Sequence, residues 1–424
     1  MPLQSSAKIW KLIQQKNSKY NFDWSLIIIL VSLIIFGLTV LSSALATQKI
    51  SDYQSDWFSQ LIFGVWIGGG LCLFISRVDY HNWFKWNKWL LIITITLLGY
   101  LAGFIIFGWI TRRNLVNIVE SVKSFPIRPS LKNGALRWIN VTFLPSFQPA
   151  ELAKITFLVY VAKQFTELKS GAIGLFDLRK ILWMFAFISF IILIQPDLGS
   201  VIILFTILIT AFVIGKVPPK IILTITGLSL IIALVAISLY SYRAERVSTF
   251  WDFLKNSQDA CVSDKGNSKN FQVCQARQAI VSGGLFGKGY NQGSYKQDKD
   301  SPIPEISTDA IFAVVGEEFG FIGALVLISL YLFLFIRGMK VSQSAPDLGG
   351  QILAAGVVVW ILFQAFTNIA GITGLIPLKG ITLPFISKGN SAYLFNMVAY
   401  GILINISGQA KKNKLIPKKF LVKR

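Results

Sequence analysis

The chain has 424 residues, of which 54% are hydrophobic and 14% charged, and its formal net charge is +21. A mean hydropathy of +0.60 excludes an ordinary soluble protein. The positive charge could suggest nucleic acid as a partner, but the sequence has no nucleic-acid-binding motif and no soluble basic domain. We therefore attribute the charge to membrane topology and to contact with anionic membrane lipids.

Apolar runs of about 18 or more residues are typical of membrane-spanning helices, and the sequence offers ten candidates. The expected fold class is all-α: one polytopic helical bundle in a membrane. The fifth and sixth runs are separated only by Gln195, Pro196 and Asp197, so a merged or re-entrant segment stays open. The candidate spans are 24–46, 57–76, 87–110, 148–165, 181–196, 198–215, 219–240, 309–337, 350–372 and 390–408.

Both ends of the chain are rich in lysine, and basic flanks stay on the cytoplasmic side of a membrane. Ten spans would place both ends on the same side, in agreement with that rule. The expected organisation is a cytoplasmic tail at 1–23, a transmembrane domain at 24–408 and a second cytoplasmic tail at 409–424. The first apolar run is too long for the core of a signal peptide, so we interpret it as a retained anchor.

The outer loop at 111–147 is basic, which opposes the orientation rule. Long loops cross membranes largely regardless of charge, so the loop can be uninformative. It can also be a surface for an anionic ligand such as a lipid diphosphate, because the guanidinium fork of arginine matches phosphate oxygens. Its charged residues are Arg112, Arg113, Lys123, Arg128, Lys132 and Arg137, against the single acid Glu120.

The outer loop at 241–308 contains two of the three cysteines, Cys261 and Cys274. Loop cysteines on the oxidising face of a bacterial-type membrane can pair, and we predict this disulfide, with two free thiols as the alternative. Cys72 lies in the second apolar run and is expected to be a small buried side chain.

Several chemistries can be excluded from the sequence. His81 is the only histidine, so no zinc site of the usual kind can be built, and we predict no protein metal site. The glycines at 282–289 precede no strand–helix unit of the kind that binds nucleotides. Nothing suggests ATP hydrolysis.

Ionisable residues inside membrane spans are costly, so each suggests a functional site. Glu151 and Lys154 lie three residues apart on one helical face and can pair with each other. Asp197 can bind a ligand or cap the next helix. Glu317 and Glu318 point about 100° apart on a helix, so at least one should meet a cation or a buried donor.

Asp309 lies at the start of the long apolar run at 309–337. An aspartate in the first turn of a helix is commonly a capping residue, and the helix dipole stabilises its ionised form. A general base must also be ionised, so capping and catalysis do not exclude each other.

Five separated blocks of the sequence carry distinctive motifs, at 134–154, 195–200, 246–289, 304–320 and 368–387. They resemble motifs of the SEDS family, the RodA/FtsW-type peptidoglycan glycosyltransferases, and the resemblance covers nearly the whole chain. The form of the block at 282–289 is closer to RodA than to FtsW. Departures occur at Ala310, at 388–391, in a longer segment after the first block and in the segment bounded by the two loop cysteines.

The resemblance implies polymerisation of lipid II, with release of polyprenyl diphosphate, at the outer face of a bacterial cytoplasmic membrane, for cell elongation and shape. It implies Asp309 as general base, and a class B penicillin-binding protein as partner. No cofactor is implied with certainty, and a divalent cation stays open. A transporter of the lipid-linked precursor and an inactive scaffold of a cell-wall synthase are the alternatives. The residues expected to bind substrate are Arg137, Trp138, Lys379, Glu151 and Lys154.

Small residues in the late spans could form the surface that meets the partner, or they could pack within the bundle. They are Gly349, Gly350, Ala354, Ala355, Gly356, Ala370 and Gly371.

Overall fold

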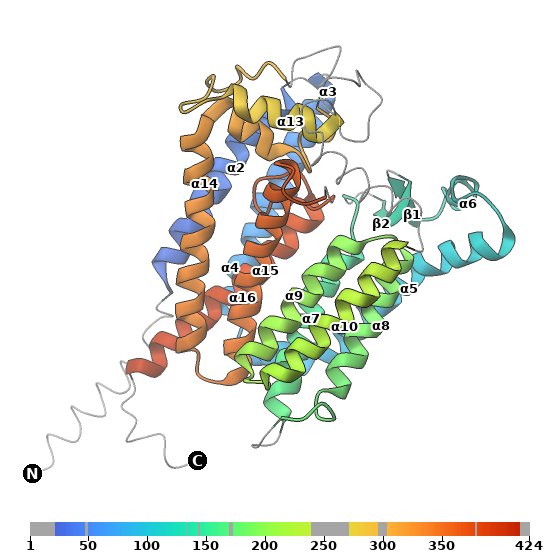
Figure 1. The fold of residues 1–424 in the computed structure, drawn as a ribbon, viewed down its shortest axis with the longest axis vertical. Coiled ribbons are helices and arrows are strands. Elements are labelled where there is room, and N and C mark those ends of the chain that lie inside the picture. Colours follow the sequence, from blue (N-terminus) through green and yellow to red (C-terminus); the bar gives the residue numbers. More distant parts are fainter. Residues whose placement is uncertain are drawn as a thin grey trace, which may run out of the picture.

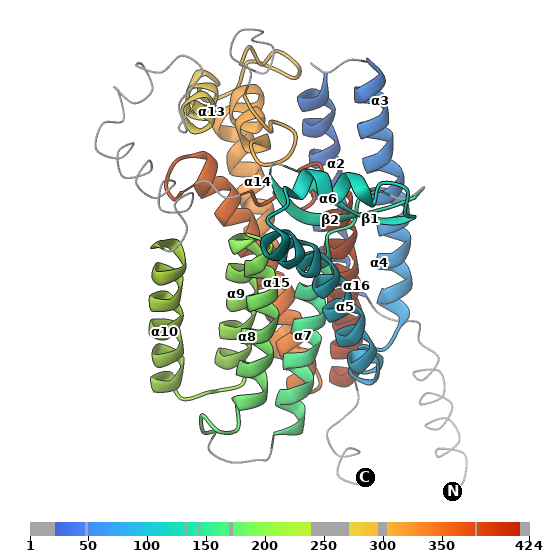
Figure 2. The ribbon, with the colours of Figure 1, turned by 90° about the vertical axis from the view of Figure 1, so that its right-hand side faces the viewer.

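The computed structural model describes residues 22–46, 50–132, 134–142, 145–168, 173–238, 271–295, 303–377 and 380–415. Most of the described helices run lengthwise and form an elongated bundle (Figures 1 and 2). We call the end that carries α13 and the β1–β2 hairpin the hairpin end. The opposite end, where α2 begins and α16 ends, is the terminal end.

The described elements follow the predicted order closely. They are α2 (Trp24–Leu45), α3 (Ile50–Ser59), η1 (Gln60–Ile67), α4 (Gly68–Arg77), α5 (His81–Thr111), α6 (Leu115–Ser121), β1 (Ile127–Lys132), β2 (Ala135–Val141), α7 (Pro149–Glu167), α8 (Arg179–Ile194), α9 (Leu198–Ile214), α10 (Pro219–Ser238), α13 (Phe271–Ser282), α14 (Ile311–Ser344), α15 (Leu348–Ile372) and α16 (Asn390–Leu415).

Helices occupy all ten predicted spans, with α3, the π-helical η1 and α4 forming one continuous stretch. Among the described residues, six helices are long and apolar enough to cross a membrane, whereas α9 and part of α10 form shorter apolar helices. The polytopic helical class is confirmed, and the number of spans stays a prediction. The helix α16 runs to Leu415, past the boundary expected at 408.

The segment at 179–214 is a pair of helices rather than one merged span. The chain reverses at Gln195–Pro196–Asp197, where the amides of Gln195 and Asp197 both donate to the carbonyl of Ile192. The two helices α8 and α9 then lie side by side in both views (Figures 1 and 2).

The helices α15 and α16 form the centre of the bundle, since most of their described residues are buried. The small residues of α15 are used for internal packing. Ala354 and Ala355 are fully buried, and a Cβ added at Gly356 would lie 2.3 Å from a methyl carbon of Leu158 on α7. The hypothesis that these residues form a partner surface is therefore wrong, because other helices of the same chain already cover them.

The basic loop at 111–147 contains structure that the sequence analysis did not predict. The strands β1 and β2 form an antiparallel hairpin, and their register shifts between Ser130 and Leu131. Ser130 pairs with Trp138 and Leu131 pairs with Leu136, which leaves Arg137 as the extra residue of a β-bulge. A bulge bends a strand and redirects the side chain at that position.

The first and last described helices are joined at the terminal end. The Asp23 carboxylate caps α2 by accepting from the Ser25 amide at 3.1 Å, and it also accepts from Nε of Arg337 on α14 at 2.7 Å. On α16, the Tyr400 hydroxyl donates to the Leu26 carbonyl at 2.8 Å, and the Ser407 hydroxyl accepts from the Asp23 amide at 3.3 Å. These contacts bring α2, α14 and α16 together.

Candidate functional site

Two amide side chains, one helical turn apart on α15, organise the polar centre of the hairpin end. The first is Gln364, whose Oε1 accepts from Nζ of Lys154 at 3.2 Å. Its Nε2 donates to the carbonyl of Thr382 at 3.0 Å. Gln364 therefore connects α7 to the loop at 380–389.

The second amide side chain is Asn368, which is 2% exposed. Its Nδ2 donates to the carbonyl of Ile381 at 2.7 Å and to the carbonyl of Asp309 at 2.8 Å. Its Oδ1 is buried and has no hydrogen-bond partner among the described residues. Asn368 thus fixes the backbone of Asp309 and leaves one polar acceptor beside it.

Asp309 is half-buried and lies one residue before Ala310, which is the N-cap of α14. The first turn of α14 contains no acidic residue, so the interpretation that placed Asp309 in that turn is wrong. A Cβ added at Gly380 would lie 3.2 Å from Oδ2 of Asp309. A side chain larger than the hydrogen of glycine at position 380 would therefore require the Asp309 carboxylate to shift.

The chain just before Asp309 is held by the loop at 380–389. The Ser387 hydroxyl donates to the Thr308 carbonyl at 2.5 Å, and the Lys388 amide donates to the Ser307 carbonyl at 2.8 Å. The Lys388 ammonium pairs with Asp56 on α3. This residue stands at one of the departures from the family pattern, and here it ties the loop to a third helix.

Glu151 and Lys154 form the expected pair on α7. The Lys154 ammonium lies 2.8 Å from Oε1 and 2.7 Å from Oε2 of Glu151, and the two residues are only 1% and 6% exposed. The ammonium also lies 4.9 Å from the ring centroid of Trp360. The ammonium of this buried pair therefore has partners in the Glu151 carboxylate, the Gln364 amide oxygen and the Trp360 ring.

Asp197 caps α9, as one of the two interpretations predicted. Its carboxylate accepts from the Ser200 amide at 3.1 Å and from the Ser200 hydroxyl at 2.7 Å. It also accepts from Nε2 of Gln148 at 3.2 Å, which joins the start of α7 to the start of α9.

The bulged Arg137 reaches the same turn between α8 and α9. Its guanidinium donates to the carbonyls of Gln195 at 3.1 Å and Pro196 at 2.5 Å. The half-buried Trp138 follows it on β2. Arg137 thus anchors the hairpin to the helix turn while it remains half-exposed.

Glu317 and Glu318 hold the segment at 283–295 against α14. Glu317 accepts from the Lys288 ammonium at 2.7 Å and from the Ser294 amide at 2.7 Å. Glu318 accepts from the Ser43 hydroxyl at 2.7 Å. The expectation that at least one of these acids meets a cation or a buried donor is confirmed.

Glycines allow the same segment to touch the backbone of α14. The helix is kinked at Gly320, where φ is 65°, and Gly287 has a φ of 81°. A Cβ at Gly320 would lie 2.3 Å from the amide nitrogen of Gly287. The carbonyls of Gly284 and Leu285 accept hydrogen bonds from the amides of residues 321 and 322, just beyond the kink.

Lys379 and Cys261 lie outside the described residues. Cys274 is disulfide-bonded, and Cys72 is a buried free thiol. Within the described ranges, no group of three or more His, Cys, Asp or Glu residues could hold a metal ion.

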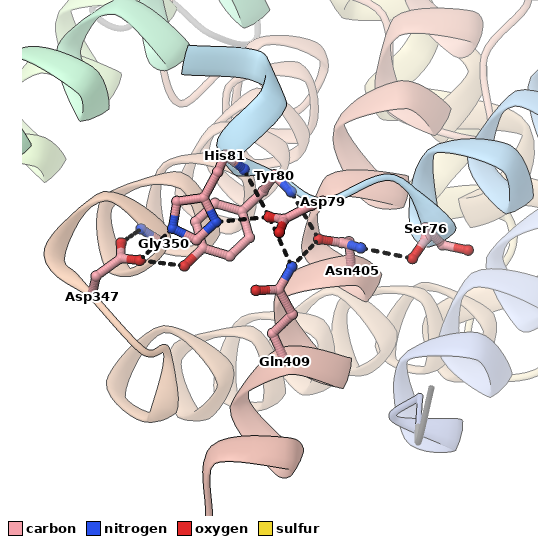
Figure 3. A network of polar contacts seen from close by, with 8 residues as sticks. All are labelled: Ser76, Asp79, Tyr80, His81, Asp347, Gly350, Asn405 and Gln409. Carbon is pink, nitrogen blue, oxygen red and sulfur yellow. Dashed lines mark hydrogen bonds and ion pairs between the residues drawn. The ribbon is translucent and has the colours of Figure 1, made fainter. Parts of the chain in front are cut away.

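A second polar network lies at the terminal end (Figure 3). His81 stands between two carboxylates, with Nδ1 2.7 Å from Asp79 and Nε2 2.9 Å from Asp347. The Tyr80 hydroxyl donates to Asp347 at 2.5 Å, and Gln409 on α16 donates to Asp79 at 3.1 Å. The network joins the α4–α5 turn to α15 and α16, and it lies at the opposite end from Asp309.

Sequence reasoning missed Gln364, and it placed Asn368, Gly380 and Thr382 in one motif without giving them a role. One pattern could have found two of them. Gln364 and Asn368 are polar residues at a spacing of four in an otherwise apolar helix, so they share one face.

Comparisons with known proteins agree on one family. The family model described as "Cell cycle protein", covering FtsW, RodA and SpoVE, matches residues 23–412. Stage V sporulation protein E of Bacillus subtilis (strain 168) is 33% identical over 398 residues, covering 92% of this chain and 98% of that protein. The probable peptidoglycan glycosyltransferase FtsW of Geobacter sp. (strain M18) is 30% identical over 396 residues, covering 91% and 97%.

Two solved structures share the fold. A chain from a peptidoglycan synthase complex has a TM-score of 0.70 and 21% identity, with 92% of this chain and 99% of that chain covered. The rod shape determining protein RodA of Thermus thermophilus has a TM-score of 0.61 and 20% identity, with 91% and 97% covered. On the family match over almost its entire length, the chain belongs to the FtsW/RodA/SpoVE family of cell cycle proteins.

Proposed function

We propose that this protein is a peptidoglycan glycosyltransferase that polymerises lipid II into glycan strands. The observation that carries the proposal is the position of Asp309, a half-buried carboxylate just before the start of α14. Its backbone carbonyl accepts a hydrogen bond from Asn368, and its Oδ2 lies next to Gly380. The activity is that of FtsW relatives about 30% identical to this chain over more than nine-tenths of its length.

In the proposed reaction, the 4-hydroxyl of a GlcNAc attacks C1 of a MurNAc, and polyprenyl diphosphate leaves. Asp309 takes the hydroxyl proton as general base. The diphosphate gains negative charge as the bond breaks, so cationic groups at the same face lower the barrier. Arg137 and Lys379 are the cations that we assign to this role, and we assign Trp138, which follows Arg137 on β2, to substrate binding.

The buried pair Glu151–Lys154 is connected to the site through Gln364. Because Lys154 bonds to Gln364 and Gln364 bonds to Thr382, the pair acts on the loop that borders Asp309. Loss of either charge would leave its partner buried and uncompensated, which costs about 3–5 kcal/mol. We therefore assign these residues to positioning of the loop.

The protein would work at the outer face of a bacterial cytoplasmic membrane, with both termini in the cytoplasm and a class B penicillin-binding protein as partner. One support for the partner is that a structure with the same fold comes from a peptidoglycan synthase complex. We assign the protein to cell elongation because the form of its 282–289 block is the RodA form.

The test is the Asp309→Asn variant, purified and incubated with lipid II. Removal of the charge should lower glycan polymerisation by at least about 100-fold, as expected for the loss of a general base. Glu305→Gln is the matched control, because Glu305 is an exposed acid in the same segment whose carboxylate accepts from Thr308 at 2.9 Å. It should keep activity within about 3-fold of wild type.

Melting temperatures of both variants should stay close to the wild-type value. Activity of Asp309→Asn within a few-fold of wild type would refute the assignment. Movement of lipid II across vesicles without glycan products would favour the transporter instead.

A further inference from the structure

A groove of about 600 Å³ lies between α7 and α8 at the terminal end of the bundle. It shares no residue with the candidate site around Asp309. Its lining residues are Tyr160, Arg179, Lys180, Trp183, Met184 and Phe187.

The mouth of the groove is cationic. Arg179 and Lys180 are exposed and are the first two residues of α8. The Arg179 guanidinium lies 3.8 Å from the ring centroid of Phe176, a contact that orients it while its edges remain able to donate. Neither cation has an ion-pair partner among the described residues, and no acid lines the groove. The two positive charges of Arg179 and Lys180 are suited to binding an anion.

The part of the groove lined by Trp183, Met184 and Phe187 of α8 is apolar. The Tyr160 hydroxyl donates to the Lys180 carbonyl at 3.1 Å and so fixes α7 to the first turn of α8. One turn further along α8, Trp183 is 75% exposed, and Phe187 follows after another turn with 47% exposed. Phe190 extends the same exposed stripe. A ligand with an apolar chain would cover this stripe, whereas a free anion would not.

Basic residues gather at this end of the bundle. Lys216 lies exposed in the turn between α9 and α10, and Lys220 lies exposed in the first turn of α10. Arg337 and Lys340 lie in the C-terminal part of α14, which ends at Ser344. An excess of basic residues is typical of the cytoplasmic side, where the leaflet is rich in anionic lipids.

We propose that the α7–α8 groove binds one anionic phospholipid of the adjacent leaflet. The lipid phosphate contacts Arg179 and Lys180, and one acyl chain lies along Trp183 and Phe187. The proposal concerns binding alone and does not depend on the proposed activity.

The experiment is a titration of the full-length protein in detergent with phosphatidylglycerol or phosphatidylcholine, followed by native mass spectrometry. Wild type should bind one phosphatidylglycerol more tightly than all further lipids, and more tightly than phosphatidylcholine. The double variant Arg179→Gln, Lys180→Gln should bind this first phosphatidylglycerol about 10- to 30-fold more weakly, the effect of two charges near a membrane surface. Its affinity for phosphatidylcholine should not change.

The matched control removes the same charge from the next turn, with Lys216→Gln and Lys220→Gln. This control should keep the tight phosphatidylglycerol site. An equal loss in the control would mean that net charge alone attracts the lipid, and the proposal would fail. Retention of the tight site by the Arg179 and Lys180 variant would also overturn it.

The apolar part of the site has its own test. Trp183→Ala should weaken the same first phosphatidylglycerol, and inorganic phosphate at millimolar concentration should not displace it. Displacement by phosphate, with no effect of Trp183→Ala, would identify a simple anion site and contradict the proposal.

Discussion

At the scale of single residues, the Asp309 carboxylate has its present position because Gly380 beside it has no side chain. Replacement of Gly380 by alanine places a methyl group 3.2 Å from Oδ2 of Asp309, so the carboxylate must move by a few tenths of an ångström. Small displacements of a reacting group are costly to rate. We expect Gly380→Ala to lower glycan polymerisation by about 10-fold at an unchanged melting temperature.

The control for this prediction is Gly389→Ala in the same loop. A Cβ at Gly389 would meet its nearest neighbour, a methyl carbon of Thr382, at an ordinary contact distance of 3.5 Å. Equal effects of the two alanines on polymerisation would show that the loop, rather than the space beside Asp309, is sensitive.

Asp79, in the turn between α4 and α5, gives the structure a dependence on pH. Partial burial acts to raise the pKa of Asp79, but hydrogen bonds from His81 and Gln409, with the charge of His81, outweigh burial and lower that pKa. A carboxylate whose pKa is lower in the folded state stabilises the fold above its unfolded pKa. That stabilisation is lost as the pH falls through the folded pKa.

We therefore expect the melting temperature of wild type to fall on acidification below about pH 4, the region of an unperturbed aspartate. The Asp79→Asn variant should lose part of this dependence and melt lower than wild type at pH 7. Parallel melting curves against pH for the two proteins, measured in the same detergent, would contradict this role of Asp79.

At the scale of elements, the kink of α14 depends on two glycines that face each other. Gly320→Ala would force a methyl group toward the Gly287 amide and would also place alanine at a φ of 65°. Left-handed strain of this kind costs on the order of 1–3 kcal/mol before the clash is counted. We expect a lower melting temperature and faster proteolysis of the segment at 283–295.

Gly284→Ala separates strain from contact. Gly284 has a φ of 56°, but a Cβ there would meet nothing within 4 Å. This variant should lose less stability than Gly320→Ala. If the two variants show the same decrease in melting temperature, the close approach between the backbones of Gly287 and Gly320 does not contribute to stability.

At the scale of the whole molecule, Asp23 joins three helices: its carboxylate contacts α2 and α14, and its amide donates to Ser407 on α16. Asp23→Asn keeps an oxygen to cap α2 but removes the charge that Arg337 meets. Asp23 is 4% exposed, whereas the Arg337 side chain is 38% exposed, so solvent weakens the pair. We expect a loss on the order of 1–2 kcal/mol, seen as a lower melting temperature.

Glu167→Gln is the control, since Glu167 is 54% exposed and lies 3.7 Å from Lys163 within one helix. Exposed pairs of this kind contribute between about 0 and 1 kcal/mol. A control as unstable as Asp23→Asn would argue against any special role for the contact between helices.

The bundle could be predicted from the sequence because each span is a local feature: an apolar run bounded by polar residues. The hairpin at 127–141 could not be predicted in this way. Its strands are short, and its sequence lacks a regular alternation of apolar and polar residues. The site was found in part. Asp309 stood out as an acid beside an apolar run. The closeness of Gly380 to Asp309, and the bond from Gln364 to the loop that contains Gly380, depend on contacts between distant segments, which periodicity does not encode.

The junction of α2 with α14 and α16 has a consequence for the synthesis of the protein. The Asp23 amide donates to the hydroxyl of Ser407, which is 384 positions later in the chain. The Asp23 carboxylate pairs with the guanidinium of Arg337, which is 314 positions later. At translation rates of about 5–20 residues per second, the longer interval is roughly 20–80 s. During that time α2 is inserted without its final neighbours. A chain that stops before α16 would therefore leave the start of α2 without the contacts that Ser407 and Tyr400 supply in the complete molecule.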